Sequence, residues 1–323
     1  MKKRQRVRHV VAMCAVLLVV CLLGTSALVW LYRYPYSLAS RPAAVLHEAG
    51  EFGYLSDDTG ALSLPTLRAQ QAFVYDCEKQ AILYRKGANK VVYPASTTKL
   101  LTILCALEHI APETVVTPGE ELSLVDASSS RAYITSAHRL TVEMLIEGML
   151  LPSGNDAAYV LAAAVGEKLS QGRAKGAEAV AVFMQEMRAY AGRIGLVGTE
   201  FTTPDGLAQR EHYSTVEDMV LISRLAMQND IIRRYASMAE DDVVYASGHT
   251  NHWKNSNLLV RPDSAYYDAR VTGLKTGSLE HNFCLIFTAE ADGHSYIVGL
   301  FGEWEKMDRY EDARAILEVL FNE

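Results

Sequence analysis

Strand-like patterns stand at the two ends of the main part of this chain, and a long helix-like block separates them. Short β-prone runs at 72–75 and 81–84 flank the polar stretch 76–80, which predicts a hairpin. After Tyr266 the strand pattern returns, and Asp292-Gly293 supplies turn residues between the last two runs. The later elements are expected as strands at 270–275, 282–289 and 296–301, and as a closing helix at about 309–321.

Between Ser96 and about Met238 the apolar residues recur at helical spacing. Strands at both ends bury their faces by joining one sheet, so the helical block is expected as an insertion. The sequence therefore predicts an α+β fold: one antiparallel sheet formed from both ends of the domain, flanked by helices, with an inserted and mainly helical subdomain at about 96–240. A cleft is expected where the two parts meet. The helical runs lie near 100–107, 142–149, 157–169, 177–194 and 215–227.

The first 32 residues combine a basic cluster with an apolar run. Positions 1–9 are rich in lysine and arginine, and 10–31 contains no charged residue. About 20 helical residues cross a bilayer, and a basic flank stays in the cytoplasm. We expect a cytoplasmic segment at 1–9, a single membrane anchor at 10–32, a linker at 33–68 and an extracytoplasmic folded domain at 69–323.

A cleavable signal peptide followed by secretion is the alternative interpretation of this N-terminus. The small residues TSA at 25–27 would form the cleavage site. The apolar character continues past this site through 28–31, and Trp30 and Tyr32 suit a membrane interface. These features favour a retained anchor.

Composition narrows the classes of function. Half of the 323 residues are hydrophobic and the formal net charge is −7, which suits a folded domain and gives no general attraction to nucleic acid. The sequence has neither the HExxH spacing of a metallopeptidase nor the GxSxG elbow of an α/β-hydrolase. Neither a metal nor another cofactor is predicted.

Three cysteines lie beyond the apolar run: Cys77, Cys105 and Cys284. Their spacing matches no zinc pattern, and Cys105 and Cys284 have apolar neighbours, so buried free thiols are the favoured interpretation. A disulfide between two of them is the alternative in an oxidising compartment.

The first motif with chemical meaning is Ser96-Thr-Thr-Lys99. It follows a proline and precedes an apolar-periodic run, so it should occupy the first turn of a helix, where residues three apart share a face. A serine hydroxyl needs a base to accept its proton, and a lysine serves only if burial or a neighbouring cation destabilises its ammonium. Lys275 is a candidate for that cation. Alone, the motif also fits an ordinary helix start.

The second motif, Ser153-Gly-Asn155, follows Leu151-Pro152 in a break between two helical runs. Proline and glycine make the break, and the polar pair is expected to face outward. Alone, the pattern is typical of a helix cap, in which Ser153 or Asn155 accepts hydrogen bonds from backbone N–H groups.

The third motif, Lys275-Thr276-Gly277, is expected at the end of a strand. Gly277 would let a substrate backbone approach the strand closely, and Lys275 with Thr276 offers a cation and a hydroxyl to a carboxylate. Alone, it fits a turn with a solvated lysine. The three motifs in this order point to one site.

Motifs of the types Ser-x-x-Lys, Ser-Asp-Asn and Lys-Thr-Gly are the signature of class A β-lactamases and penicillin-binding proteins. Over about 69–323 the chain resembles the low-molecular-mass penicillin-binding proteins of the D-alanyl-D-alanine carboxypeptidase type, which carry Ser-Gly-Asn as the second motif. The matching stretches are YPASTTKLLT at 93–102, LLPSGNDAA at 150–158, TPDGL at 203–207, HYST at 212–215, NSNL at 255–258 and GLKTG at 273–277.

This resemblance implies a β-lactamase/transpeptidase-like fold and a serine carboxypeptidase. Such an enzyme removes the terminal D-alanine from peptidoglycan stem peptides ending in D-Ala-D-Ala, and β-lactam antibiotics acylate it. Ser96 would attack the peptide carbonyl and form an acyl-enzyme, with Lys99 as the base. Ser153 would relay a proton to the departing D-alanine, and Asn155 would hold Lys99 and a substrate amide.

The resemblance also implies a substrate-binding strand at Lys275, Thr276, Gly277 and Ser278. Lys275 and Thr276 would bind the terminal carboxylate, and the backbone N–H groups of Ser96 and Ser278 would form the oxyanion hole. Two departures stand out. Many relatives carry histidine where this chain has Ser278, and many are tethered by a C-terminal amphipathic anchor that the N-terminal span would replace here.

Two other functions share the three motifs. A class A β-lactamase requires a Glu-x-x-Leu-Asn-type segment after the second motif, and 193–207 contains none. A non-catalytic sensor of penicillin or peptidoglycan would be acylated without hydrolysis, but the sequence shows no evident output module for it. The carboxypeptidase is the favoured interpretation.

Overall fold

The computed structural model describes residues 61–207 and 211–321, which belong to one unit of the chain. The expected cytoplasmic segment, the membrane anchor and most of the linker lie outside these residues. Within the two described ranges, no helix is both long and apolar enough to cross a membrane.

A five-stranded antiparallel sheet joins the two ends of the described chain. Its strands lie in the order β2-β1-β9-β8-β7, so the first strand of the domain pairs with the last one. Ala72 lies opposite Leu300, and Val74 lies opposite Val298. This pairing confirms the sheet predicted from both ends of the domain. The strands are β1 Gln71–Asp76, β2 Ala81–Lys86, β7 Val271–Leu279, β8 Asn282–Ala291 and β9 His294–Glu303.

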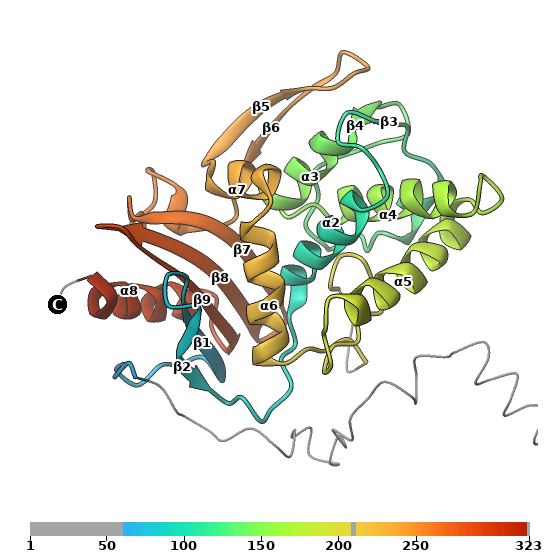
Figure 1. Cartoon of the computed structure of the whole chain (residues 1–323). Helices are drawn as coiled ribbons and strands as arrows, with labels where there is room; N and C mark the ends of the chain where they lie inside the picture. Colours follow the sequence, from blue (N-terminus) through green and yellow to red (C-terminus); the bar gives the residue numbers. More distant parts are fainter. Residues whose placement is uncertain (1–60, 208–210, 322–323) are drawn as a thin grey trace, which may run out of the picture. The chain divides into compact units, whose positions relative to one another are not determined.

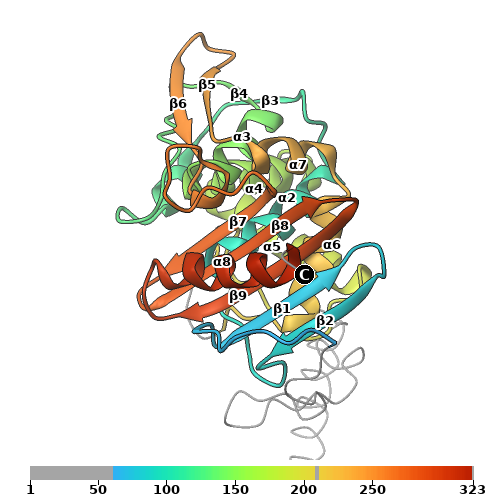
Figure 2. The ribbon, with the colours of Figure 1, turned by 90° about the vertical axis from the view of Figure 1, so that its left-hand side faces the viewer.

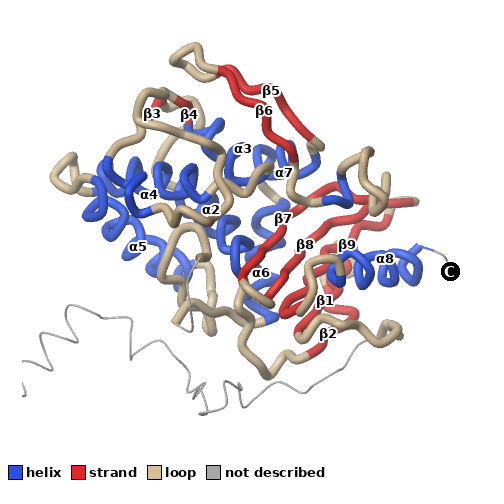
Figure 3. Tube along the Cα trace, turned by 180° about the vertical axis from the view of Figure 1, so that it is seen from behind, coloured by secondary structure: helices blue, strands red, loops and turns tan. Residues whose placement is uncertain are grey.

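Both faces of this sheet are covered. Along β1, Phe73 packs into the core shared with the helical half, whereas Val74 packs into a second core under α8 (Asp308–Phe321). Figure 2 shows α8 lying across one face of the sheet, and Figure 3 shows the other helices gathered beyond its opposite face. All six residues of β1 are therefore buried, as expected for a strand between two layers.

The block between β2 and β7 is mainly helical, as predicted (Figure 1). Asp292 and Gly293, with φ of 53° and 81°, form the expected turn between β8 and β9. Cys77, Cys105 and Cys284 are free thiols, of which the first is half-buried and the other two are buried. The inserted helices are α2 Lys99–Leu107, α3 Val142–Leu150, α4 Asn155–Leu169, α5 Gly176–Arg193, α6 Val216–Met227 and α7 Asp230–Ser237.

Two parts of this block differ from the prediction. A hairpin of β5 (Glu240–Val244) and β6 (Thr250–Lys254) precedes the point where strands were expected to return. Its first strand, EDDVV, is acidic, and only Val243 on β5 and Trp253 on β6 are buried, so no apolar alternation marks it. The two-residue strands β3 (Val115–Val116) and β4 (Leu140–Thr141) are too short to show any periodicity.

The strand β7 is longer than predicted. The apolar pattern ends at Lys275, but the pairing with β8 continues to Leu279, which lies opposite Asn282. The Lys275–Gly277 motif therefore lies within the strand and not at its end. Cross-strand hydrogen bonding extends the strand where its own side chains carry no β signal.

Helices α4 and α5 approach each other closely at Gly166. A Cβ atom added there would lie 1.8 Å from the backbone oxygen of Ala179 on α5. Because α4 begins at Asn155, this contact also fixes the helix that carries a candidate site residue.

We expect Gly166→Ala to lower the free energy of unfolding by at least about 1–3 kcal/mol, because the two helix backbones must separate. Gly192→Ala is the matched control. A Cβ added at Gly192, within α5, meets no described atom of another element within 4 Å, and alanine is the better helix former. Urea unfolding of the two variants measures the difference, and equal stabilities would contradict the close packing at Gly166.

Candidate active site

Ser96 lies in a short 3-10 turn, η1 (Ala95–Thr98), which leads directly into α2. Residues three apart eclipse one another in such a turn, so Lys99 lies over Ser96. Lys99 Nζ donates a hydrogen bond of 2.8 Å to Ser96 Oγ. The predicted pairing of these two side chains at a helix start is confirmed, with the first turn tighter than an α-helix.

Lys99 is completely buried, and all three of its ammonium hydrogens have partners. Besides Ser96, its Nζ donates to Asn155 Oδ1 at 2.7 Å and to the backbone oxygen of Asp205 at 2.9 Å. Burial lowers the pKa of Lys99 to about 8, against the opposing negative charges of Asp205 and Asp156. Desolvation, and not the charge of Lys275, is thus the main cause of the shift.

Ser153 and Asn155 are buried, with 5% and 2% of their surface exposed, so the expectation that they face outward is wrong. Ser153 has a left-handed φ of 62°, and Asn155 is the first residue of α4. Next to them, the Asp156 carboxylate accepts hydrogen bonds from the backbone N–H groups of Ala132 and Ile134, at 2.8 and 2.9 Å. A Cβ atom added at Gly154 would lie 2.7 Å from Ala132 Cβ, so the loop at Ala132 packs directly against the motif.

Lys275, from the middle of β7, points into the same site. It is completely buried, and its Nζ donates to Ser153 Oγ at 2.8 Å and to the backbone oxygen of Thr276 at 2.9 Å. Burial and the positive charges of Lys99 and Arg309 hold the pKa of Lys275 well below its usual range. The two lysines therefore hold the Ser153–Asn155 turn from both sides.

Gly277 brings β7 against the turn that carries Ser96. A Cβ atom at Gly277 would lie 2.7 Å from the backbone oxygen of Pro94. On the same strand, the hydroxyl group of Thr276 shares a hydrogen bond of 2.7 Å with the hydroxyl group of Ser256. The structure thus brings the three sequence motifs together, and it adds Ser256 beside the third.

The segment at 203–207 contributes a backbone carbonyl to the site, that of Asp205. A motif of side chains gives no information about such a backbone contact. Gly206 has a φ of 83°, and a Cβ atom there would lie 1.9 Å from the backbone oxygen of Ala95. Only glycine fits this position, and the close approach holds the Asp205 carbonyl against Lys99.

His212 contacts the turn that carries Ser96 and is held as a neutral ring. Burial and the charge of Lys99 lower the pKa of His212 to about 3. Its Nδ1 accepts from the backbone N–H of Thr202 at 3.1 Å, which leaves Nε2 to donate to Thr98 Oγ1 at 2.7 Å. The ring also stacks on Phe201, with centroids 4.6 Å apart.

Arg309 is a buried cation that sequence reasoning missed. From α8, its Nη1 donates to the backbone oxygens of Gly277 at 2.8 Å and Cys284 at 3.0 Å, and to Ser278 Oγ at 3.3 Å. It ties β7 and β8 together beside the site. An arginine on an amphipathic helix normally indicates a solvent-exposed face, so the sequence carried no signal for this position.

A serine hydrogen-bonded to a buried lysine, at the junction of a sheet and an inserted helical block, is the arrangement expected of a serine peptidase of the penicillin-binding class. Residues 58–303 match the family profile described as D-alanyl-D-alanine carboxypeptidase, peptidase family S11. The chain belongs to this family, and it is a serine-type D-alanyl-D-alanine carboxypeptidase of low molecular mass.

Two curated relatives illustrate the family. A D-alanyl-D-alanine carboxypeptidase of Streptomyces sp. strain K15 is 31% identical over 271 residues, which are 81% of this chain and 90% of the relative. DacF of Bacillus subtilis, also named a D-alanyl-D-alanine carboxypeptidase, is 25% identical over 259 residues. The match covers 79% of this chain and 62% of DacF.

Solved structures agree on the fold. The crystal structure of the Streptomyces K15 DD-transpeptidase has a TM-score of 0.72 and 29% identity, and the match covers 81% of this chain and all of that one. Penicillin-binding protein D2 of Listeria monocytogenes, in an ampicillin-bound form, has a TM-score of 0.63 and 28% identity, over 79% of this chain and 99% of that one. The predicted transpeptidase-like architecture is confirmed.

We expect Gly206→Ala to slow acylation by a fluorescent penicillin at least about tenfold, which corresponds to 1.4 kcal/mol of barrier. The added methyl group would push the Asp205 carbonyl and the Ser96 turn apart. Gly248→Ala is the matched control, because Gly248 has nearly the same φ of 81° but no described atom within 4 Å of an added Cβ. Wild-type acylation by Gly206→Ala would contradict the role given to this contact.

Proposed function

We propose that Ser96 is the nucleophile of this carboxypeptidase and that Lys99 is its general base. The observation that carries the proposal is the hydrogen bond of 2.8 Å between a fully buried lysine and the serine hydroxyl. In its neutral form the Lys99 amine accepts the hydroxyl proton as Ser96 attacks the carbonyl between two D-alanines. The product of this step is an acyl-enzyme on Ser96.

We assign to Ser153 the return of a proton to the departing D-alanine. Its hydroxyl accepts a hydrogen bond from Lys275 Nζ, so its own hydrogen is free to point toward the leaving amine. Asn155 holds Lys99 through its Oδ1, which leaves its NH₂ group as a donor for a substrate carbonyl. Both roles need the buried positions that these side chains occupy.

The third motif supplies the substrate-binding edge. β7 is the terminal strand of its sheet, so an extended stem peptide can add beside it. Lys275 lies beneath the surface, where its positive charge attracts the terminal D-Ala carboxylate, while the Thr276 hydroxyl contacts the carboxylate directly. Ser256 orients that hydroxyl through the shared hydrogen bond.

The oxyanion hole is assigned to the backbone N–H groups of Ser96 and Ser278. The support for this assignment is the close approach of Gly277 to Pro94, which brings the neighbouring residue Ser278 next to the nucleophile turn. Water then hydrolyses the acyl-enzyme. Relatives named as a carboxypeptidase and as a DD-transpeptidase share the fold, and the two reactions differ in whether water or an amine accepts the acyl group.

Ser96→Ala should abolish release of D-alanine from a pentapeptide that ends in D-Ala-D-Ala, by about 10³-fold or more, because no acyl-enzyme can form. Ser237→Ala, at the exposed end of α7, is the control and should keep full activity. Free D-alanine is the readout. Release that survives in Ser96→Ala would refute the assignment of the nucleophile.

Incubation with penicillin, run beside the D-alanine assay, separates the alternatives. Rapid turnover of penicillin would identify a β-lactamase. A persistent penicillin adduct without any release of D-alanine would identify a sensor.

The rate of acylation should depend on pH through Lys99. Its pKa is lowered to about 8, and the base is the deprotonated amine, so the active fraction grows as pH rises through about 8 and falls in acid. Acylation by penicillin should therefore rise between about pH 6 and 9 and then level off. Lys99→Arg, which stays protonated, should remove both the reaction and its pH dependence. A flat wild-type profile would exclude Lys99 as the base.

We propose that residues 10–32 anchor the enzyme in the cell membrane with residues 69–323 outside, where peptidoglycan lies. The uncharged apolar run and its basic flank support this orientation. The chain should stay with the membrane after an alkaline carbonate wash, and a protease added outside should reach the folded domain. Recovery of the mature chain in the medium would instead support cleavage and secretion.

A further inference from the structure

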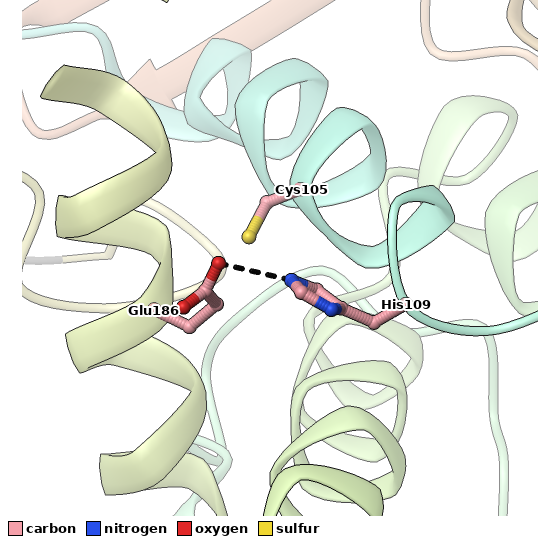
Figure 4. Close-up of side chains that lie close together, drawn as sticks. All are labelled: Cys105, His109 and Glu186. Atoms are coloured by element: carbon pink, nitrogen blue, oxygen red, sulfur yellow. Dashed lines mark hydrogen bonds and ion pairs between the residues drawn. The ribbon is translucent and has the colours of Figure 1, made fainter. Parts of the chain in front are cut away.

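A second cluster of reactive side chains lies where α2 meets α5, away from the catalytic residues. Cys105 comes from the last turn of α2, His109 follows two residues after its end, and Glu186 lies on α5. A sulfur, a ring nitrogen and a carboxylate oxygen of these residues all lie within 4.8 Å of one another. Figure 4 shows the three side chains pointing toward a common space between the two helices.

The cluster lies between the core and the surface of the protein. His109 Nε2 lies 3.0 Å from Glu186 Oε1, and Arg193 Nη2 donates to the same oxygen at 2.6 Å. The Cys105 side chain is completely buried, whereas those of His109 and Glu186 are 22% and 21% exposed. An ion can therefore enter from the side of His109 and Glu186 and meet the thiol beneath them.

We propose that Cys105, His109 and Glu186 form a binding site for a divalent transition metal ion, with zinc as the best match. Thiolate, imidazole and carboxylate are the three ligand types that zinc prefers, and a water molecule would complete a tetrahedral set. Zinc bonds of about 2.0–2.3 Å place neighbouring ligand atoms roughly 3.3–3.7 Å apart. Donors already within 4.8 Å reach that spacing by small side-chain rotations.

The spacing in the sequence supports the same site. Cys105 and His109 are four residues apart, which places them on one face of the helix end. A search for zinc spacings among cysteines alone or histidines alone misses a mixed pair of this kind. Glu186 joins the pair only through the packing of α5 on α2.

The charges balance with a metal bound. A Cys105 thiolate and the Glu186 carboxylate together carry two negative charges, which offset a divalent ion. In the metal-free protein the Arg193 guanidinium pairs with the Glu186 carboxylate and offsets its negative charge in place of the ion. The Arg193 side chain is 52% exposed, so it can swing into solvent when the metal binds. The ion must also displace the thiol proton, as in other zinc–thiolate sites.

An ordinary ion-pair network is the competing interpretation, and it accounts for only part of the cluster. It explains the contacts among His109, Glu186 and Arg193, but it does not explain why the sulfur of Cys105 points toward the same space. The two interpretations make opposite statements about Cys105 and Arg193. A metal site needs the sulfur and competes with the guanidinium, whereas an ion pair needs the guanidinium and ignores the sulfur.

The metal would have a structural role. Cys105 lies six residues beyond Lys99 on α2, which is about 9 Å further along the helix axis at 1.5 Å per residue. A bound ion would clamp the end of α2 to α5 without touching the catalytic groups. It should raise the melting temperature and leave the rate of acylation by penicillin unchanged.

The test is a titration of the full chain, reduced and held in mild detergent, with Co²⁺ followed by Zn²⁺. Cobalt should give a sulfur-to-metal charge-transfer band in the near ultraviolet together with the visible bands of a tetrahedral ion, and Zn²⁺ should abolish both. Zn²⁺ should also raise the melting temperature. Absence of the charge-transfer band in the wild-type chain would overturn the proposal.

Variants identify the ligands. Cys105→Ser should remove the charge-transfer band and weaken Zn²⁺ binding at least about tenfold, and Glu186→Gln should weaken binding similarly. Cys284→Ser is the matched control, because Cys284 is equally buried but lies in the sheet. It should keep the band. A band that persists in Cys105→Ser would place the metal on other cysteines and refute the site.

Arg193→Gln keeps the proposal testable even if a ligand variant fails to fold. Removing the competing guanidinium should tighten Zn²⁺ binding severalfold if Glu186 is a ligand. Unchanged or weaker binding in Arg193→Gln would contradict the proposed competition. Penicillin acylation of Cys105→Ser at the wild-type rate would show that the metal site and the catalytic site are separate, and a loss of acylation with the fold intact would overturn the structural role.

Discussion

The site is organised by two buried ammonium groups that must satisfy their hydrogen-bond donors away from water. Burying an unpaired charge costs a large free energy, so each lysine must be surrounded by oxygen atoms that accept its hydrogen bonds. Lys99 takes the Ser96 hydroxyl, the Asn155 side chain and the Asp205 carbonyl, and Lys275 takes the Ser153 hydroxyl and the Thr276 carbonyl. The geometry that we propose for catalysis is thus the same geometry that makes burial of the two cations tolerable.

This arrangement also tunes proton affinity. The pKa of each lysine falls because the cation is desolvated, which brings Lys99 into the range where it can act as a base near neutral pH. Burial also keeps the ring of His212 neutral. The same burial therefore favours the neutral forms of both Lys99 and His212.

Close backbone approaches hold the segments of the candidate site together. Gly206 meets Ala95, and Gly277 meets Pro94, so the turn that carries Ser96 is held between a loop of the helical half and a strand of the sheet. Arg309 then fixes that strand from α8 through backbone oxygens. Helix α2 extends this frame outward, with Lys99 at its first residue and Cys105 in its last turn beside α5.

The sequence by itself determined the types of the main elements, the sheet built from both ends, the inserted helices and the three motifs, because periodicity and short motifs are local properties. It carried no signal for the short strands β3 to β6. It could not determine how long β7 is, since pairing with β8 extends that strand beyond its own β signal. It wrongly placed Ser153 and Asn155 at the surface, because a helix cap and a buried turn share one local pattern. Only the tertiary structure decided that Asp205 and Arg309 are buried beside the site and that Glu186 meets Cys105, because these contacts depend on packing between residues far apart in the chain.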